Sequence, residues 1–230
     1  SRKAWKEMGE QLGKPKAIVA VSGHWVTKGV SVRRAEDNPQ INDMYGFPEE
    51  LYAVHYEPKS NVAVADKVIK ALNAKVDNTW GIDHGVWSVL SNMYPEADVP
   101  IVMVSVDASA APQSMFEIGQ KLEALCEEGI MIVCSGNVVH NLRLVNWRMR
   151  GGEKWADDFD VLVKNLIEKK DYESVVNFPL LKDWQKAIPT TEHYYPLLVA
   201  LGAAGKDSKV MVWNEYRELG SMSMTSYLFE

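Results

Sequence analysis

Short, unbroken hydrophobic runs alternate along this chain with stretches that have helical spacing. Three such runs stand out, at 16–25 (KAIVAVSGHW), 100–107 (PIVMVSVD) and 130–136 (IMIVCSG). A continuous run of this length is typical of a strand that is buried on both faces of a sheet. The pattern therefore predicts three buried strands at the centre of the fold.

Hydrophobic residues at intervals of three and four predict helices between and around these strands. The predicted helices cover 3–12, 60–72, 83–94, 112–129, a segment that ends near 169, and 191–205. Ser60 is the expected N-cap of the second helix, and Gly13 and Gly129 are expected to end the first and the fourth. Two late strands are predicted at 210–216 and 222–229.

This alternation of helices and strands predicts an α/β fold. We expect a single domain over 1–230, with a central mostly parallel or mixed sheet and helices on both faces. No internal repeat, low-complexity tract or long linker interrupts the sequence.

Composition narrows the class of protein. The chain has 230 residues, of which 47% are hydrophobic and 24% charged, as in ordinary globular proteins. Its net charge of −6 and the lack of a long Lys/Arg block argue against a nucleic-acid partner. No hydrophobic run reaches the roughly 18 residues that a membrane span needs. Cys126 and Cys134 are interpreted as reduced core thiols, and we expect a cytoplasmic protein.

Histidines follow two of the predicted strands. His24 comes after AIVAVSG and His140 comes shortly after IMIVCSG, and in both the Ser-Gly pair is expected to let the backbone turn sharply. Ligands of α/β proteins collect at the carboxyl ends of the strands. His84 and His193 stand near the predicted starts of two helices. One such histidine is usually structural, but several at one edge would indicate a metal site, because imidazole is a common metal ligand.

Several common motifs are missing from the sequence. It has no His-Glu-x-x-His helix and no paired Cys-x-x-Cys of a standard zinc site. It also has no Gly-x-Ser-x-Gly elbow, no Gly-x-Gly-x-x-Gly and no P-loop. A serine hydrolase or a nucleotide-dependent enzyme is therefore not favoured.

Longer motifs resemble one known family over nearly the whole chain. They are, in order, VSGHW, YGFPEELYAVHY, WGIDHGVWSVL, MYPEADVPIVMVSVD, EEGIMIVCSGNVVHNL and TEHYYPLLVALGAA. This series resembles the DOPA-dioxygenase-like branch of the class III extradiol ring-cleavage dioxygenases. The resemblance implies an enzyme that opens a catechol ring beside its two hydroxyls, with O₂ and a non-haem Fe²⁺. Zn²⁺ is expected to occupy the same site in purified protein.

The resemblance also implies roles for particular residues. His24 and His193 would be metal ligands, His140 the acid–base group, and His84 a residue of the substrate or oxygen pocket. A neutral histidine suits the acid–base role, because it takes a catechol proton and later returns one.

Three further residues are expected at the substrate: Tyr45, Asn137 and Tyr194. Tyr45 belongs to the 42–48 segment, NDMYGFP, which is interpreted as a loop over the site. Two alternatives stay open, because Asn137 could instead bond the turn backbone and Tyr194 could pack in the core.

One family feature is missing. Members of this family carry a Gly-His-Gly segment some 20 to 30 residues before SGHW, and its histidine is the first metal ligand. We expect such a segment to precede Ser1; without it, His140 becomes the candidate third ligand.

Two other classes of function remain as alternatives. One is a non-catalytic metal-binding or signalling protein of the same fold, and the other is a zinc-dependent hydrolase, since zinc binds imidazole readily. Oxygen uptake with a catechol, after anaerobic reconstitution with Fe²⁺, separates all three. The sequence leaves open which catechol is cleaved, and whether the chain forms a homo-oligomer.

Overall fold

The computed structural model describes residues 2–230. Contacts divide this part of the chain into two compact units. The sheet unit is the chain through Asp107 together with Ala124–Ser135, and the C-terminal unit is Ala108–Glu123 with Gly136–Glu230. The single domain over 1–230 stays a prediction.

The sheet unit contains a five-stranded sheet with the order β3-β2-β4-β1-β5. Its strands are β1 (Ala17–Val26), β2 (Ser31–Val32), β3 (Lys75–Val76), β4 (Ile101–Val106) and β5 (Ile130–Ser135). β1 pairs in parallel with both β4 and β5, whereas β2 is antiparallel to β4 and parallel to β3. The predicted mixed α/β sheet is confirmed.

Burial differs between the central strands and the edge strand. β4 is buried throughout, and β1 is buried over most of its length, as the hydrophobic runs predicted. β5 is only partly buried beyond Ile130, so the prediction of burial on both faces is wrong for this strand. The reason is its place in the sheet, because β5 lies at the edge and has one neighbour.

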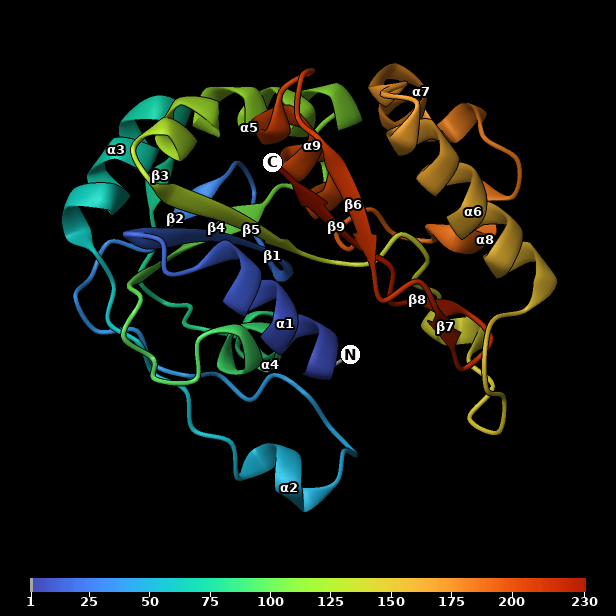
Figure 1. Cartoon of the computed structure of the whole chain (residues 1–230), viewed down its shortest axis with the longest axis horizontal. Helices are drawn as coiled ribbons and strands as arrows, with labels where there is room; N and C mark the ends of the chain where they lie inside the picture. The colour runs from blue at the N-terminus through green and yellow to red at the C-terminus, as the bar shows by residue number, and fades with distance from the viewer. Residues whose placement is uncertain (1) are drawn as a thin grey trace. The chain divides into compact units, whose positions relative to one another are not determined.

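Helices flank this sheet. The sheet unit has α1 (Arg2–Leu12), α2 (Glu49–Tyr52), α3 (Val62–Leu72) and α4 (His84–Met93). Figure 1 shows α1 and α4 on one side of the sheet and α3 on the other. The N-cap of α3 is Asn61 rather than Ser60, because the Asn61 side chain accepts a hydrogen bond from the backbone N–H of Val64 at 3.1 Å.

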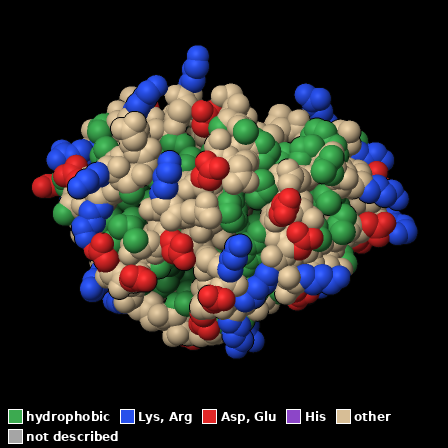
Figure 2. Space-filling view, turned by 90° about the horizontal axis from the view of Figure 1, so that it is seen from above, with side chains coloured by type: hydrophobic (Ala, Val, Ile, Leu, Met, Phe, Trp, Pro, Cys, Tyr) green, Lys and Arg blue, Asp and Glu red, His purple; other side chains and the backbone are tan. Residues whose placement is uncertain are grey.

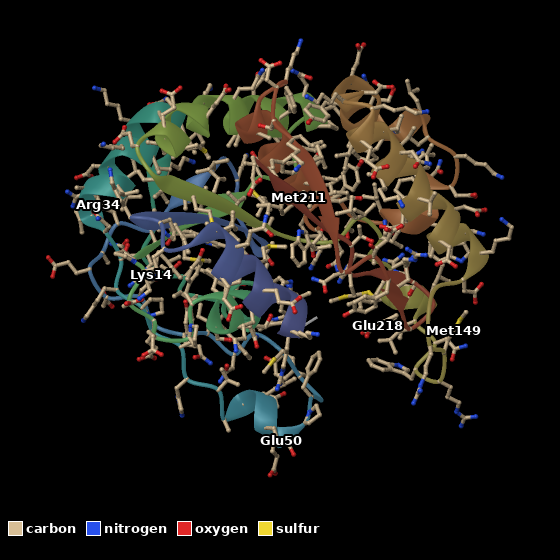
Figure 3. The ribbon with its side chains drawn as sticks, viewed as in Figure 1. Lys14, Arg34, Glu50, Met149, Met211 and Glu218 are labelled. Atoms are coloured by element: carbon tan, nitrogen blue, oxygen red, sulfur yellow. The ribbon has the colours of Figure 1, made fainter. Side chains whose placement is uncertain are left out.

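Surface ion pairs of the sheet unit join loops to these helices. Figure 3 shows Arg34 beside α3, where its Nη2 donates to Asp66 Oδ2 at 3.0 Å. Such exposed pairs contribute little to stability, because water and dissolved salt screen the two charges.

The C-terminal unit is mainly helical and ends in short antiparallel strands. Its helices are α6 (Lys154–Glu168), α7 (Tyr172–Val176), α8 (Trp184–Ala187) and α9 (Tyr195–Ala204), with 3-10 turns η1 (Leu142–Leu144) and η2 (Phe178–Leu180). Two strand pairs follow, β6 (Val210–Trp213) with β9 (Ser226–Phe229), and β7 (Arg217–Glu218) with β8 (Met222–Ser223). The predicted strand over 222–229 is thus two strands. α5 (Pro112–Glu127) has residues in both units.

A buried carboxylate ties the last strands of this unit to α6. Asp160 on α6 is 1% exposed and accepts hydrogen bonds from Arg217 Nη1 (3.1 Å), Ser223 Oγ (2.5 Å) and Thr225 Oγ1 (2.7 Å). Arg217 also donates from Nε to Asp157 Oδ1 at 2.7 Å. The side chain of Asp157 is 40% exposed, so water competes for that bond.

We expect Asp160→Ala to destabilise the protein by about 3–5 kcal/mol, because it leaves the half-buried Arg217 charge and two hydroxyls without their acceptor. Asp157→Ala is the matched control, since it removes a carboxylate from the same arginine at a partly exposed position, at a cost of about 1 kcal/mol or less. Urea unfolding of both variants measures the difference. Equal losses in the free energy of unfolding would show that the burial of Asp160 does not increase its contribution to stability.

The cysteines, the lengths of the helices and the surface charges bear on the expectations from composition. Cys126 and Cys134 are free thiols, as predicted, but Cys126 is exposed and therefore is not a core residue. Among residues 2–230, no helix has the length and apolar character needed to cross a bilayer. On the face drawn in Figure 2, Lys and Arg side chains are interspersed with Asp and Glu.

Candidate active site

His24 lies within β1, and the strand does not end at Ser22-Gly23 as predicted. β1 continues to Val26, and its pairing with β4 shifts between Ser22 and Val26. Such a bulge re-aims the side chains of the bulged residues. The backbone N–H of His24 donates to Ser22 Oγ at 3.1 Å, and the His24 side chain is 23% exposed.

Asp43 connects His24 to His84. His24 Nδ1 is 2.8 Å from Asp43 Oδ2, and His84 Nδ1 is 2.9 Å from Asp43 Oδ1. The backbone N–H of His84, at the start of α4, also donates to Asp43 Oδ1 at 2.8 Å. Asp43 belongs to the 42–48 loop, which leads into α2, whose Glu50 is labelled in Figure 3.

The glycine after His84 allows this cluster to be compact. The rings of His24 and His84 meet edge to face, with centroids 4.2 Å apart. A Cβ at Gly85 would lie 3.0 Å from His24 Cδ2 and 2.9 Å from Ser135 Oγ. A larger residue would therefore push His24 and the end of β5 away from α4.

The pKa values of the two carboxylates beside these rings, Asp43 and Asp83, are shifted in opposite directions. Burial alone would raise the pKa of Asp43, but hydrogen bonds from His24 and from the side chain and backbone of His84 outweigh it and hold that pKa well below its usual range. Asp83 is fully buried, and burial raises its pKa. Hydrogen bonding therefore favours the ionised form of Asp43 beside the two imidazoles, whereas burial disfavours the ionised form of Asp83.

In the C-terminal unit, His193 and His140 form a second cluster. Their rings stack face to face, with centroids 3.7 Å apart and planes within 4° of parallel. His193 lies in the turn before α9, and its Nδ1 is 3.4 Å from Glu192 Oε1. Burial would raise the pKa of Glu192, but hydrogen bonds from His193 and Thr190 lower it to about 2. The structure thus pairs His193 with an ionised carboxylate.

The segment after β5 packs closely on the main chain of His193. The backbone N–H of Asn137 donates to the His193 carbonyl at 2.8 Å, and a Cβ at Gly136 would lie 2.2 Å from that oxygen. Gly136 is not among the glycines with positive φ, so a sharp turn is the wrong reason for this glycine. Close approach of the backbone is the reason instead.

The three expected substrate contacts lie in different surroundings. Tyr45 is 92% exposed on its loop. Asn137 donates from Nδ2 to the Ser223 carbonyl at 2.6 Å, a backbone group distant in sequence rather than one of its own turn. Tyr194 is buried and donates its hydroxyl to the Val175 carbonyl at 3.0 Å. Their contacts with a substrate stay predictions.

Asp43 is the main residue that the sequence analysis missed. The available signal was a carboxylate in a loop already expected near the site. Histidines that bind metals usually give their other ring N–H to a carboxylate or carbonyl. Sequence alone does not show which of several acidic residues meets a given histidine.

The donor set fits a first-row transition metal. Within the described part of the chain, one ligand atom each from His24, Asp43 and His84 can be chosen so that all lie within 4.8 Å of one another. Imidazole and carboxylate groups are ligands of non-haem iron as well as of zinc. The surroundings of His24 are therefore suited to a metal-dependent enzyme.

Comparison with known proteins identifies the family. The family described as the catalytic LigB subunit of aromatic ring-opening dioxygenase matches residues 2–230. The chain belongs to the LigB family. The predicted class of enzyme, an extradiol ring-cleaving dioxygenase that depends on a metal, is confirmed.

Curated relatives of this LigB-family chain agree with that class. A protein of Escherichia coli (strain K12) named 4,5-DOPA dioxygenase extradiol is 42% identical, over 97% of this chain and 86% of its own length. Proteins of the same name from Beta vulgaris (35% identical, 94% of this chain and 83% of its own length) and Mirabilis jalapa (33%, 98% and 86%) are also similar. An uncharacterized protein from Escherichia coli K12 of known crystal structure gives a TM-score of 0.86 at 37% identity, over 98% of this chain and 91% of that one.

Proposed function

We propose that this dioxygenase opens the ring of a catechol amino acid of the DOPA type beside its hydroxyls, with O₂ and Fe²⁺. The observation that carries the proposal is the pair of histidine clusters, each with a carboxylate at a ring nitrogen, at the motif positions of a LigB-family chain. The names of the relatives from Escherichia coli, Beta vulgaris and Mirabilis jalapa support the choice of substrate.

His24 and His193 are the proposed metal ligands. In each, Nδ1 faces a carboxylate, Asp43 at 2.8 Å and Glu192 at 3.4 Å. When Nδ1–H donates to a carboxylate, coordination uses Nε2, and the carboxylate makes that nitrogen a stronger donor. Bound Fe²⁺ would supply the one-electron chemistry that allows triplet O₂ to react with a singlet catecholate.

His140 is the proposed acid–base group. Its ring is held parallel to that of His193, and its backbone N–H donates to the Ala187 carbonyl at 2.9 Å. These contacts fix the position of the imidazole before substrate binds, as proton transfer to an oriented group requires. A ring nitrogen of His140 would take a catechol proton and return it later in the reaction.

His84 is proposed to face the substrate or oxygen. Its Nδ1 lies 2.9 Å from Asp43 Oδ1, and if Nδ1–H donates there, Nε2 is the ring nitrogen left to face substrate or oxygen. Phe47 of the 42–48 loop lies near this ring, with centroids 6.3 Å apart, and adds an apolar neighbour. Tyr45, Asn137 and Tyr194 remain the proposed contacts of the substrate.

A cytoplasmic location is also proposed. Its support is the chemistry of the cysteines, because both Cys126 and Cys134 are free thiols. Free thiols are the usual state of cysteines in the reducing cytoplasm.

Oxygen uptake tests the proposed function. The protein is reconstituted anaerobically with Fe²⁺, and consumption of O₂ is measured with L-DOPA and with catechols that lack the amino-acid group. We expect one O₂ consumed for each ring opened, with the largest kcat/KM for L-DOPA. The Zn²⁺-loaded protein is the control and should be inactive, because zinc has no redox chemistry. No uptake with any catechol would overturn the proposal.

A further inference from the structure

We propose that Asp43 is a positioning residue, whose carboxylate accepts the Nδ1–H of both His24 and His84 and thereby fixes the tautomer and orientation of both rings. The metal-binding role of His24 rests on the proposed function, whereas the hydrogen bonds themselves do not. Asp43 is a loop residue outside the set of histidines.

The two oxygens of Asp43 serve different rings. Oδ2 lies 2.8 Å from His24 Nδ1, and Oδ1 lies 2.9 Å from His84 Nδ1. These distances are typical of charge-assisted N–H···O hydrogen bonds. With one oxygen for each ring, a single carboxylate holds the two imidazoles at their edge-to-face contact of 4.2 Å.

A third donor favours a hydrogen-bonding role over direct coordination of a metal by Asp43. The backbone N–H of His84 also donates to Oδ1, at 2.8 Å. A main-chain N–H cannot be a metal ligand, so this contact identifies Oδ1 as the acceptor of an N–H group. It also places the carboxylate at the N-terminus of α4, a 10-residue helix whose dipole stabilises negative charge.

The chemical consequence is that one particular ring nitrogen remains available in His24 and one in His84. A neutral imidazole has one protonated and one acceptor nitrogen. If Asp43 binds Nδ1–H in both rings, Nε2 of His24 is the ligand atom and Nε2 of His84 is the atom that meets substrate or oxygen. Without Asp43 both tautomers of each ring become accessible, and both rings lose the contact that orients them.

Asp43→Asn is the sharpest substitution. The amide has nearly the same shape but only one acceptor oxygen, and its NH₂ group cannot accept a hydrogen bond from an imidazole N–H. At least one of the two rings must therefore rotate or change tautomer. Loss of a hydrogen-bond partner of a ligating histidine typically weakens metal binding about 10- to 100-fold, and we expect that range for Zn²⁺.

The test uses ¹⁵N-histidine NMR of the full chain, metal-free and Zn²⁺-loaded, with signals assigned through His24→Gln and His84→Gln. We expect protonated Nδ1 in both rings of the unmodified protein, and loss of at least one of these N–H signals in Asp43→Asn. A competing chromophoric chelator gives the Zn²⁺ affinity, which should fall while saturating Zn²⁺ still reaches the stoichiometry of the unmodified protein.

Asp77→Asn is the matched control. Asp77 is a carboxylate of the same unit that accepts hydrogen bonds from the backbone N–H (2.9 Å) and Oγ1 (2.7 Å) of Thr79. This variant should leave both histidine tautomers and the Zn²⁺ affinity unchanged. Equal effects of the two substitutions would attribute the result to general loss of structure and overturn the role of Asp43.

Two other results would overturn the inference. Unprotonated Nδ1 in His24 or His84 of the unmodified protein would do so without any variant, even if Asp43→Asn failed to fold. Complete loss of Zn²⁺ from a folded Asp43→Asn protein would make Asp43 a ligand. Because neither measurement uses catechol or O₂, failure of ring cleavage with the expected tautomers would overturn the proposed function alone.

Discussion

His24→Ala is expected to abolish bound metal and ring cleavage together. The substitution removes a proposed ligand, so its effect should exceed the about 10- to 100-fold loss caused by removing a hydrogen-bond partner of a ligand. The substitution also removes one of the two imidazoles that contact Asp43 and leaves His84 in place. Metal content after gel filtration and O₂ uptake with L-DOPA measure the two losses, and the thermal midpoint shows that the variant is folded.

His55→Ala is the control for this experiment. His55 belongs to the same unit but is exposed, and the resemblance to the family gives it no chemical role. This variant should retain metal and activity, whereas His193→Ala should behave like His24→Ala. Full metal content in folded His24→Ala would remove His24 from the ligand set.

Much of the sheet unit could be predicted from local pattern, since periodicity reports which residues face the core. The buried strands β1 and β4 and the helices α1 and α4 lie within a few residues of their predicted bounds. The strand order could not be predicted in this way, because pairing joins residues far apart in the sequence. β2 and β3 have two residues each, too few for any alternation to be visible.

Candidate site residues could be named from the sequence where they occupy distinctive places in it. His24 follows a hydrophobic run and His84 begins a helix, so each had a local signal. Asp43 had only its place in a loop expected near the site, because its contacts are with His24 and with His84, 41 residues further along the chain. Such a contact is decided by the path of the loop, which local pattern does not encode.

Gly136 shows how a correct observation received the wrong physical reason. The sequence suggested a sharp turn after the strand, which needs a flexible backbone. The structure instead shows a carbonyl oxygen, that of His193, where a Cβ would be. Tertiary packing determines how much space surrounds a glycine. Sequence alone therefore does not distinguish a glycine needed for a turn from one needed for close approach of another backbone segment.

His140→Ala is expected to keep its metal and bind catechol, yet lose most of its turnover. Removing a general acid–base group typically costs about 10²- to 10⁴-fold in rate, and the loss should appear in kcat with KM nearly unchanged. Because His140 stacks on His193, the variant also removes one face of a proposed ligand's packing, so metal content must be measured on the same sample. Added imidazole should partly restore kcat if the missing group is a proton carrier. A lower thermal midpoint with normal turnover in the folded fraction would make His140 structural, and loss of metal along with activity would make it a ligand.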